Sequence, residues 1–169
     1  ITETNFGPDH PNTGITLDNL GNAYGSLGNF EKQKELLERA LKIKETNFGP
    51  DHPNTGITLT NLGNAYGSLG NFEKKKELLE RALKIKENNF GPDHPNTGIT
   101  LFHIGQLYKS LGNLKRALEN IERAYQIFFN FPGFGPNHLH TKVAFENIQT
   151  FKKSQKLSKP IIIQNTKWP

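Results

Sequence analysis

The chain contains no cysteine and no methionine, and it has a single tryptophan, Trp168. Without cysteine it has no disulfide bonds, no catalytic thiol and no zinc site with cysteine ligands. Long apolar runs are also absent, because the longest purely aliphatic run, Ile161 to Ile163, is far shorter than the roughly 20 residues of a membrane helix. Nothing at the start resembles a signal peptide. We therefore expect a cytoplasmic protein with no membrane segment.

Sequence motifs that mark catalytic sites are missing as well. The chain has no Gly-x-x-x-x-Gly-Lys phosphate loop, no Gly-x-Ser-x-Gly elbow and no His-Glu-x-x-His helix. An aspartate precedes each of His10, His52 and His94, but these histidines fall in separate predicted loops with no second ligand at metal-binding spacing. A structural role in the loops is the favoured interpretation. We predict that the protein is not an enzyme and has no metal or other cofactor.

Most of the chain consists of one repeated unit of 42 residues. The second copy, residues 46–87, repeats the first, residues 4–45, except at two positions: Thr60 replaces Asp18 and Lys75 replaces Gln33. A third copy follows and diverges in its second half. Self-similarity at such a period indicates a solenoid, in which each unit buries its apolar face against its neighbours.

Each unit is expected to fold as two antiparallel helices. In the first copy the prolines and glycine of residues 7–12 predict a loop. A first helix is predicted over about residues 12–27 and a second over about residues 30–45, separated by a Gly-Asn turn that ends one helix and caps the next. One stripe of the first helix is apolar and predicts its buried face: Leu17, Leu20, Tyr24 and Leu27.

The copies define the predicted organisation of the chain. It comprises the end of a preceding helix at 1–3, repeats at 4–45, 46–87 and 88–131, a partial repeat or capping helix at 132–155, and an irregular basic tail at 156–169. Because the first residues align with the end of a repeat helix, we expect the array to begin earlier than Ile1. Oligomerisation through this uncapped N-terminal end is then possible.

These residues resemble the tetratricopeptide repeat. The matching positions recur in the first two copies: Leu17, Leu20, Gly21, Tyr24, Gly28, Leu37 and Ala40, then Leu59, Leu62, Gly63, Tyr66, Gly70, Leu79 and Ala82. The unit length, the Phe-Gly-Pro-Asp-His-Pro loop and the Arg-Ala-Leu-Lys-Ile helix end are similar to the kinesin-light-chain type. The resemblance, over residues 4–151, implies an all-α fold: a right-handed superhelical solenoid of antiparallel helix pairs with a C-terminal capping helix.

The sequence departs from this family where the two helices of a hairpin usually meet at a small residue. Gln33 and Lys75 occupy that position in the first two copies, and an alanine appears there only at Ala117. The sequence does not determine how closely the two helices of a hairpin approach each other in these two copies. In the capping helix Lys152 replaces the tyrosine of the pattern, which indicates that the array stops there.

A second, polar stripe on the first helix of each unit is the candidate binding site. Amide side chains dominate it, and each offers a donor and an acceptor to the backbone of an extended peptide. In tetratricopeptide proteins this helix lines the concave groove, and the resemblance implies peptide contacts for Asn19, Asn61 and Asn147. The remaining candidates on the stripe are Asn22, Asn64 and Gln106.

Selectivity is expected in the third copy. Phe102, His103 and Lys109 appear there in place of threonine, asparagine and glycine. An aromatic anchor beside a cation often dominates a binding surface. These three residues complete the candidate groove.

The expected function is a scaffold that binds a peptide segment of a partner protein, although a merely solvated face explains the amides as well. An alternative follows from the net charge of +5 and the pI near 9.4. Outer lysines such as Lys74, Lys75 and Lys76 could bind nucleic acid or acidic surfaces without specificity, but interleaved glutamates make this less favoured. A third interpretation is a spacer or oligomerisation arm of a larger protein.

Overall fold

The computed structural model describes residues 7–155, and this part of the chain contains seven α-helices and no strand. The helices are α2 (Pro11–Ser26), α3 (Phe30–Phe48), α4 (Pro53–Ser68), α5 (Phe72–Phe90), α6 (Pro95–Ser110), α7 (Leu114–Asn130) and α8 (Leu139–Gln155). The predictions for residues 1–3 and 156–169 lie outside the described residues. None of the seven helices is both long and apolar enough to cross a bilayer.

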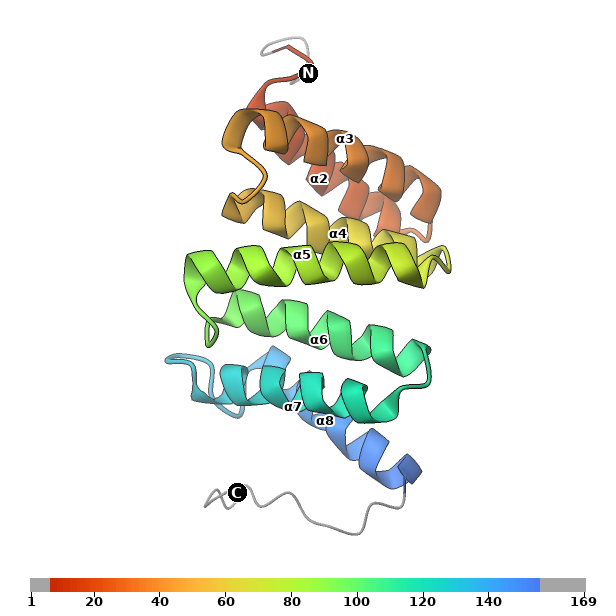
Figure 1. Cartoon of the computed structure of the whole chain (residues 1–169), viewed down its shortest axis with the longest axis vertical. Helices are drawn as coiled ribbons and strands as arrows, with labels where there is room; N and C mark the ends of the chain where they lie inside the picture. Colours follow the sequence, from red (N-terminus) through yellow and green to blue (C-terminus); the bar gives the residue numbers. More distant parts are fainter. Residues whose placement is uncertain (1–6, 156–169) are drawn as a thin grey trace.

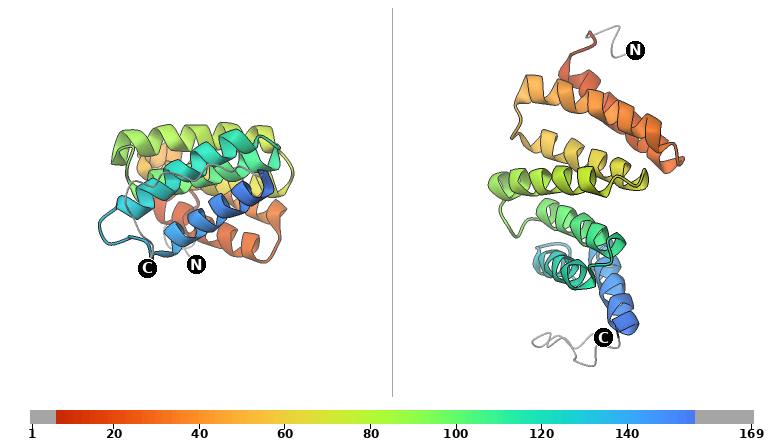
Figure 2. Two further views of the ribbon diagram at one scale, coloured as in Figure 1. Left: turned by 90° about the horizontal axis from the view of Figure 1, so that it is seen from below. Right: turned by 45° about the vertical axis from the view of Figure 1, so that its right-hand side comes forward.

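Consecutive helices form hairpins that stack along one axis. Helix α2 pairs with α3, α4 with α5, and α6 with α7, while α8 packs on α7. One layer contains α2, α4, α6 and α8, and the other contains α3, α5 and α7 (Figures 1 and 2). The all-α repeat array expected from the sequence is confirmed.

Each first helix of a hairpin begins with the same cap. The Nδ1 atom of a histidine accepts the backbone N–H two residues further on, at 3.1 Å for His10, His52 and His94 alike. The next residue is a proline at the first helical position, where a missing N–H costs no hydrogen bond. The three histidines therefore have the structural role in the loops that the sequence favoured.

The second helices are longer than predicted. Helix α3 was expected to end near Glu45 but continues to Phe48. The first backbone break is Gly49, whose φ of 95° lies in the left-handed region that favours glycine. Before it, Asn47 continues the helix and donates from Nδ2 to the carbonyl of Ile43 at 2.8 Å. Helix α5 extends in the same way, whereas the first helices lie within about a residue or two of the predicted bounds, and α8 occupies the later part of the segment 132–155.

The core is a ribbon between the two layers, divided into three clusters of buried residues. The predicted buried stripe of the first helix is only partly correct, because Leu20 is 45% exposed and Leu27 is 82% exposed. Leu62, the counterpart of Leu20 in the second copy, is 2% exposed because the first hairpin covers it. Leu27 follows the last turn of α2 and lies in the turn.

Candidate functional site

The polar stripe borders an open recess between α2, α3 and α4. The recess has a volume of about 340 Å³, and its polar lining includes Asn22, Ser26, Gln33, Asn61, Asn64 and Ser68. Three of the predicted groove residues therefore share one cavity. Asn19 is exposed on α2, one helical turn from Asn22.

Polar side chains of neighbouring first helices meet along this stripe. The Nε2 atom of Gln106 donates to Asn147 Oδ1 at 2.9 Å and so joins α6 to α8. One repeat earlier, Asn64 Nδ2 lies 3.4 Å from His103 Nε2 and joins α4 to α6. Part of the hydrogen-bonding capacity of the predicted ladder is therefore used within the protein.

The recess between α2 and α4 differs in this respect. Within residues 7–155 the side chains of Asn22 and Asn61 form no hydrogen bond with each other. Both line the recess, where their amide groups are open to a ligand. An amide donates and accepts at once, which matches the alternating N–H and C=O groups of an extended backbone.

His103 is uncharged at neutral pH. Its pKa is lowered to about 4, chiefly because burial disfavours the imidazolium and next because Lys75 and Lys86 place positive charge nearby. A neutral ring has one nitrogen that accepts a hydrogen bond, and this state allows Nε2 to accept from the amide of Asn64.

Phe102 and Lys109 do not form the aromatic and cationic pair that the sequence suggested. Phe102 is half-buried and packs against the core cluster that contains Phe128. It faces the junction between repeats rather than the groove, because it lies one residue, about 100° of helix rotation, away from the groove position of His103. The Lys109 ammonium lies 5.2 Å from the ring centroid of Phe151 instead.

Glycines of the first helices accommodate the long side chains of Gln33 and Lys75. A methyl group added to Gly25 would lie 2.5 Å from Gln33 Cδ, and one added to Gly67 would lie 2.5 Å from Lys75 Cδ. Each long side chain therefore lies directly against a glycine, and the helices of the hairpin approach closely. Because Gln33 also lines the recess, the second helix contributes to the groove.

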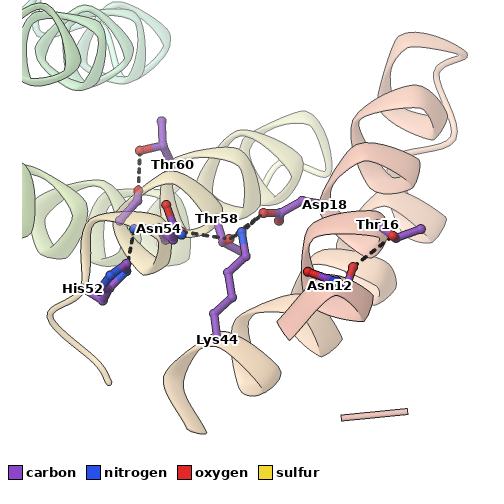
Figure 3. Close-up of polar contacts among 9 residues, drawn as sticks. Asn12, Thr16, Asp18, Lys44, His52, Asn54, Thr58 and Thr60 are labelled. Atoms are coloured by element: carbon purple, nitrogen blue, oxygen red, sulfur yellow. Dashed lines mark hydrogen bonds and ion pairs between the residues drawn. The ribbon is translucent and has the colours of Figure 1, made fainter. Parts of the chain in front are cut away.

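A buried lysine links the first two repeats. Lys44 of α3 forms an ion pair with Asp18 of α2 and donates to Thr58 Oγ1 of α4 at 3.0 Å (Figure 3). The Thr58 hydroxyl in turn donates to Asp18 Oδ2 at 2.9 Å. Sequence reasoning missed this cluster, since a lysine within a charged helix shows no sign of burial. The one available signal was Asp18, a position at which the first two copies differ.

The corresponding cluster at the second junction has no carboxylate. Lys86 Nζ donates to Thr60 Oγ1 at 3.0 Å and to Thr100 Oγ1 at 2.9 Å. Burial lowers the pKa of Lys86 to about 8. At the third junction the same positions form part of an apolar cluster: Phe102, Phe128 and Ala144. The three junctions are thus ionic, polar and apolar in turn.

Several lysines of the opposite layer are paired with glutamates of their own helix. The ion pairs are Lys32 with Glu35 at 2.7 Å, Lys34 with Glu31 at 2.9 Å and Lys74 with Glu77 at 2.8 Å. These pairs neutralise part of the outer positive charge that nucleic-acid binding requires.

Family models of the tetratricopeptide repeat match residues 34–88 and 76–128, and a further one matches residues 13–54. Together these matches cover more than half of the chain. A search of curated protein sequences found no match.

Among solved structures, the nearly identical tetratricopeptide-like repeats of a putative kinesin light chain from Podosopora anserina superpose with a TM-score of 0.76. The sequence identity is 20%, over 87% of this chain and 69% of that chain. BtubC (BKLC) from P. vanneervenii has a TM-score of 0.69 at 20% identity, over 95% of this chain and 71% of that one.

A third similar structure is the first tetratricopeptide domain of Spaghetti (RPAP3), which is bound to the HSP90 peptide SRMEEVD. It has a TM-score of 0.60 at 18% identity, over 89% of this chain and 97% of that one. At these identities the likeness concerns the fold alone.

Proposed function

Because this chain belongs to the tetratricopeptide repeat family, with repeats of the kinesin-light-chain type, we propose that it is a protein-interaction scaffold whose groove binds an extended peptide segment of a partner. The recess between α2 and α4 is the observation that carries the proposal, since the amides of Asn22 and Asn61 are open there. The Spaghetti (RPAP3) domain, which holds an HSP90 peptide, is a precedent on a similar fold.

The groove is built before the ligand arrives. Contacts between Asn64 and His103 and between Gln106 and Asn147 tie successive first helices together. The buried junction lysines add further links between hairpins. Binding therefore orders the peptide more than the protein, which limits the entropic cost. In this proposal Asn19, Asn61 and Asn147 contact the peptide backbone.

Non-specific binding of nucleic acid through the outer lysines is the less favoured candidate, because several of those lysines already pair with glutamates. The cytoplasmic location and an oligomerising N-terminal end stay predictions.

The test is an array of immobilised extended peptides with acetylated and amidated ends. It is probed with the intact chain and with the variant Asn19→Ala, Asn61→Ala, Asn147→Ala. We expect the intact chain to bind a subset of peptides and the variant to lose them while its circular dichroism remains helical. Equal binding by both proteins would contradict the proposal. Pull-down from a cell lysate with the same two proteins would then identify the partner.

A further inference from the structure

The two positions that distinguish the second repeat from the first both change charge in the same direction. Thr60 replaces Asp18 and removes a carboxylate, whereas Lys75 replaces Gln33 and adds an ammonium. All other positions of the two copies are identical. The second repeat is therefore more positive than the first at these two positions alone.

The two changes lie at opposite ends of α5, since Thr60 contacts Lys86 near its C-terminal end and Lys75 lies in its first turns, yet both leave positive charge near His103 of α6. Thr60 leaves Lys86 with only hydroxyl partners there. Lys75 and Lys86 are the two lysines whose charge reaches His103 of α6. In residues 7–155 no carboxylate forms an ion pair with Lys75 or Lys86. The junction therefore carries positive charge without a counter-charge.

The side chain of Lys75 extends from α5 toward the groove because Gly67 of α4 has no side chain in its way. A methyl group on Gly67 would lie 3.0 Å from Lys75 Nζ, so the ammonium itself lies against the glycine. The equivalent pair in the first copy, Gly25 and Gln33, lines the recess between α2 and α4. By the repeat symmetry, Lys75 borders the next section of the groove, between α4 and α6. Its half-buried position lowers its pKa, because burial disfavours the ammonium.

The first junction lacks this positive field. Gln33 is neutral, and the charge of Lys44 is compensated by Asp18. At the first junction Asn61 occupies the repeat position that His103 occupies at the second. At these positions the first section of the groove is neutral or charge-compensated, whereas the second carries uncompensated positive charge.

We propose that the groove between α4 and α6 binds an aspartate or glutamate side chain of the peptide, with Lys75 as the specificity-determining residue and Asn64 and His103 beside it. This inference rests on the proposed function and adds the chemistry of the partner: an acidic residue within the segment whose backbone lies on the amides. Hydrogen bonds from an ammonium to a carboxylate are shorter and stronger than those between neutral groups. A half-buried cation without a counter-charge gains most from such a ligand, because less solvent screens the attraction.

The test uses the full chain and peptides with blocked ends, so that no terminal carboxylate contributes. Each acidic peptide that binds is compared with its glutamine or asparagine counterpart by fluorescence anisotropy. We expect the acidic peptide to bind about tenfold more tightly, as one charge-assisted hydrogen bond would give. The variant Lys75→Gln should remove that preference, so that the acidic peptide and its amide counterpart bind equally. It is expected to fold, because glutamine is the residue at this position in the first copy.

The matched control is Lys84→Gln, which removes the same charge from an exposed position of α5. This variant should keep the preference for the acidic peptide. An equal loss in Lys84→Gln and Lys75→Gln would show general electrostatic attraction and overturn the inference. No preference in the intact chain, or an unchanged preference in Lys75→Gln, would overturn it as well.

The amide variant separates this inference from the proposed function. If the alanine variant at Asn19, Asn61 and Asn147 loses all peptides while Lys75→Gln changes nothing, the peptide groove stands and the acidic site fails. If no peptide binds the intact chain, both fail.

Discussion

Lys44 and Lys86 occupy the same position in consecutive repeats, yet only Lys44 has a buried carboxylate partner within the described part of the chain. The difference comes from one substitution, threonine at 60 in place of aspartate at 18. Both lysines are 4% exposed. The two junctions therefore place a buried lysine in almost the same surroundings, once with a carboxylate that compensates its charge and once without.

Lys86 should make stability depend on pH. Its pKa of about 8 in the folded protein lies below the ordinary value of 10.5, because burial disfavours the charged form. Between these two pH values the unfolded lysine still binds a proton that the folded one has released. The free energy of unfolding should therefore rise with pH across this window, and the contribution of Lys86 should be constant below it. Urea unfolding at successive pH values measures the effect.

The variant Thr60→Asp supplies the missing carboxylate and serves as the control. It should raise the pKa of Lys86 and thereby flatten the pH dependence over the same window. Other titrating groups are shared, so the difference between the two curves isolates Lys86. Parallel curves for the two proteins would contradict the expectation.

The reciprocal variant, Asp18→Thr, should destabilise the first junction. The variant leaves Lys44 with hydroxyl partners only, which is the situation of Lys86 in the intact chain. The loss of one buried hydrogen-bond partner should lower the free energy of unfolding by about 1–3 kcal/mol. The variant should also acquire the pH dependence expected for Lys86. Hydrogen exchange of the α3 amides, followed by mass spectrometry, would localise the change. An unchanged unfolding midpoint would mean that the Asp18 pair contributes nothing net.

Leu62→Ala and Leu20→Ala alter the same position of two copies. Leu62 is 2% exposed and Leu20 is 45% exposed. Truncation of a buried leucine removes burial and leaves a cavity, so Leu62→Ala should lower the free energy of unfolding by about 2–5 kcal/mol. Leu20→Ala should cost less than half as much. Equal losses in urea unfolding would argue against the stacked core.

Two glycine substitutions should differ in their effect on stability. A methyl group at Gly105 would overlap Cγ1 of Ile121, which is fully buried, and would lie 3.1 Å from the Ala117 carbonyl oxygen. Gly105→Ala should therefore destabilise by about 1–3 kcal/mol. Gly67→Ala meets only the flexible side chain of Lys75 and should change stability little, since alanine also favours the helix. Thermal unfolding of both variants distinguishes the two cases.

His52→Ala should remove the cap of α4. The loss of the hydrogen bond to the Asn54 backbone N–H should destabilise by about 1 kcal/mol, the usual cost of an N-cap. Because the histidine serves as a cap, zinc or a chelator should leave the unfolding temperature of the intact protein unchanged. A zinc-dependent rise that disappears in His52→Ala would show a metal role instead.

The helix pairs and their turns were predictable because their signals are local. Gly-Asn turns, the proline-rich loops and apolar residues at helical spacing act within a few residues of the chain. The amide stripe followed from the same spacing, and the structure places Asn22, Asn61 and Asn64 around one recess. The packing of Phe102 on the core cluster was not predictable in this way, because one step along the helix separates a groove position from a junction position.

The sequence by itself determined the repeat, the helix pairs and the polar stripe, since period and local propensity suffice for these. Only the tertiary structure decided in which copy a given repeat position is buried and which side chains it contacts. Leu20 and Leu62 share the same local sequence except for Asp18 and Thr60, but the first hairpin covers only Leu62. Lys44 and Lys86 likewise differ through residues contributed by neighbouring helices. Burial and charge compensation depend on the adjacent repeat, and therefore on packing rather than on local sequence.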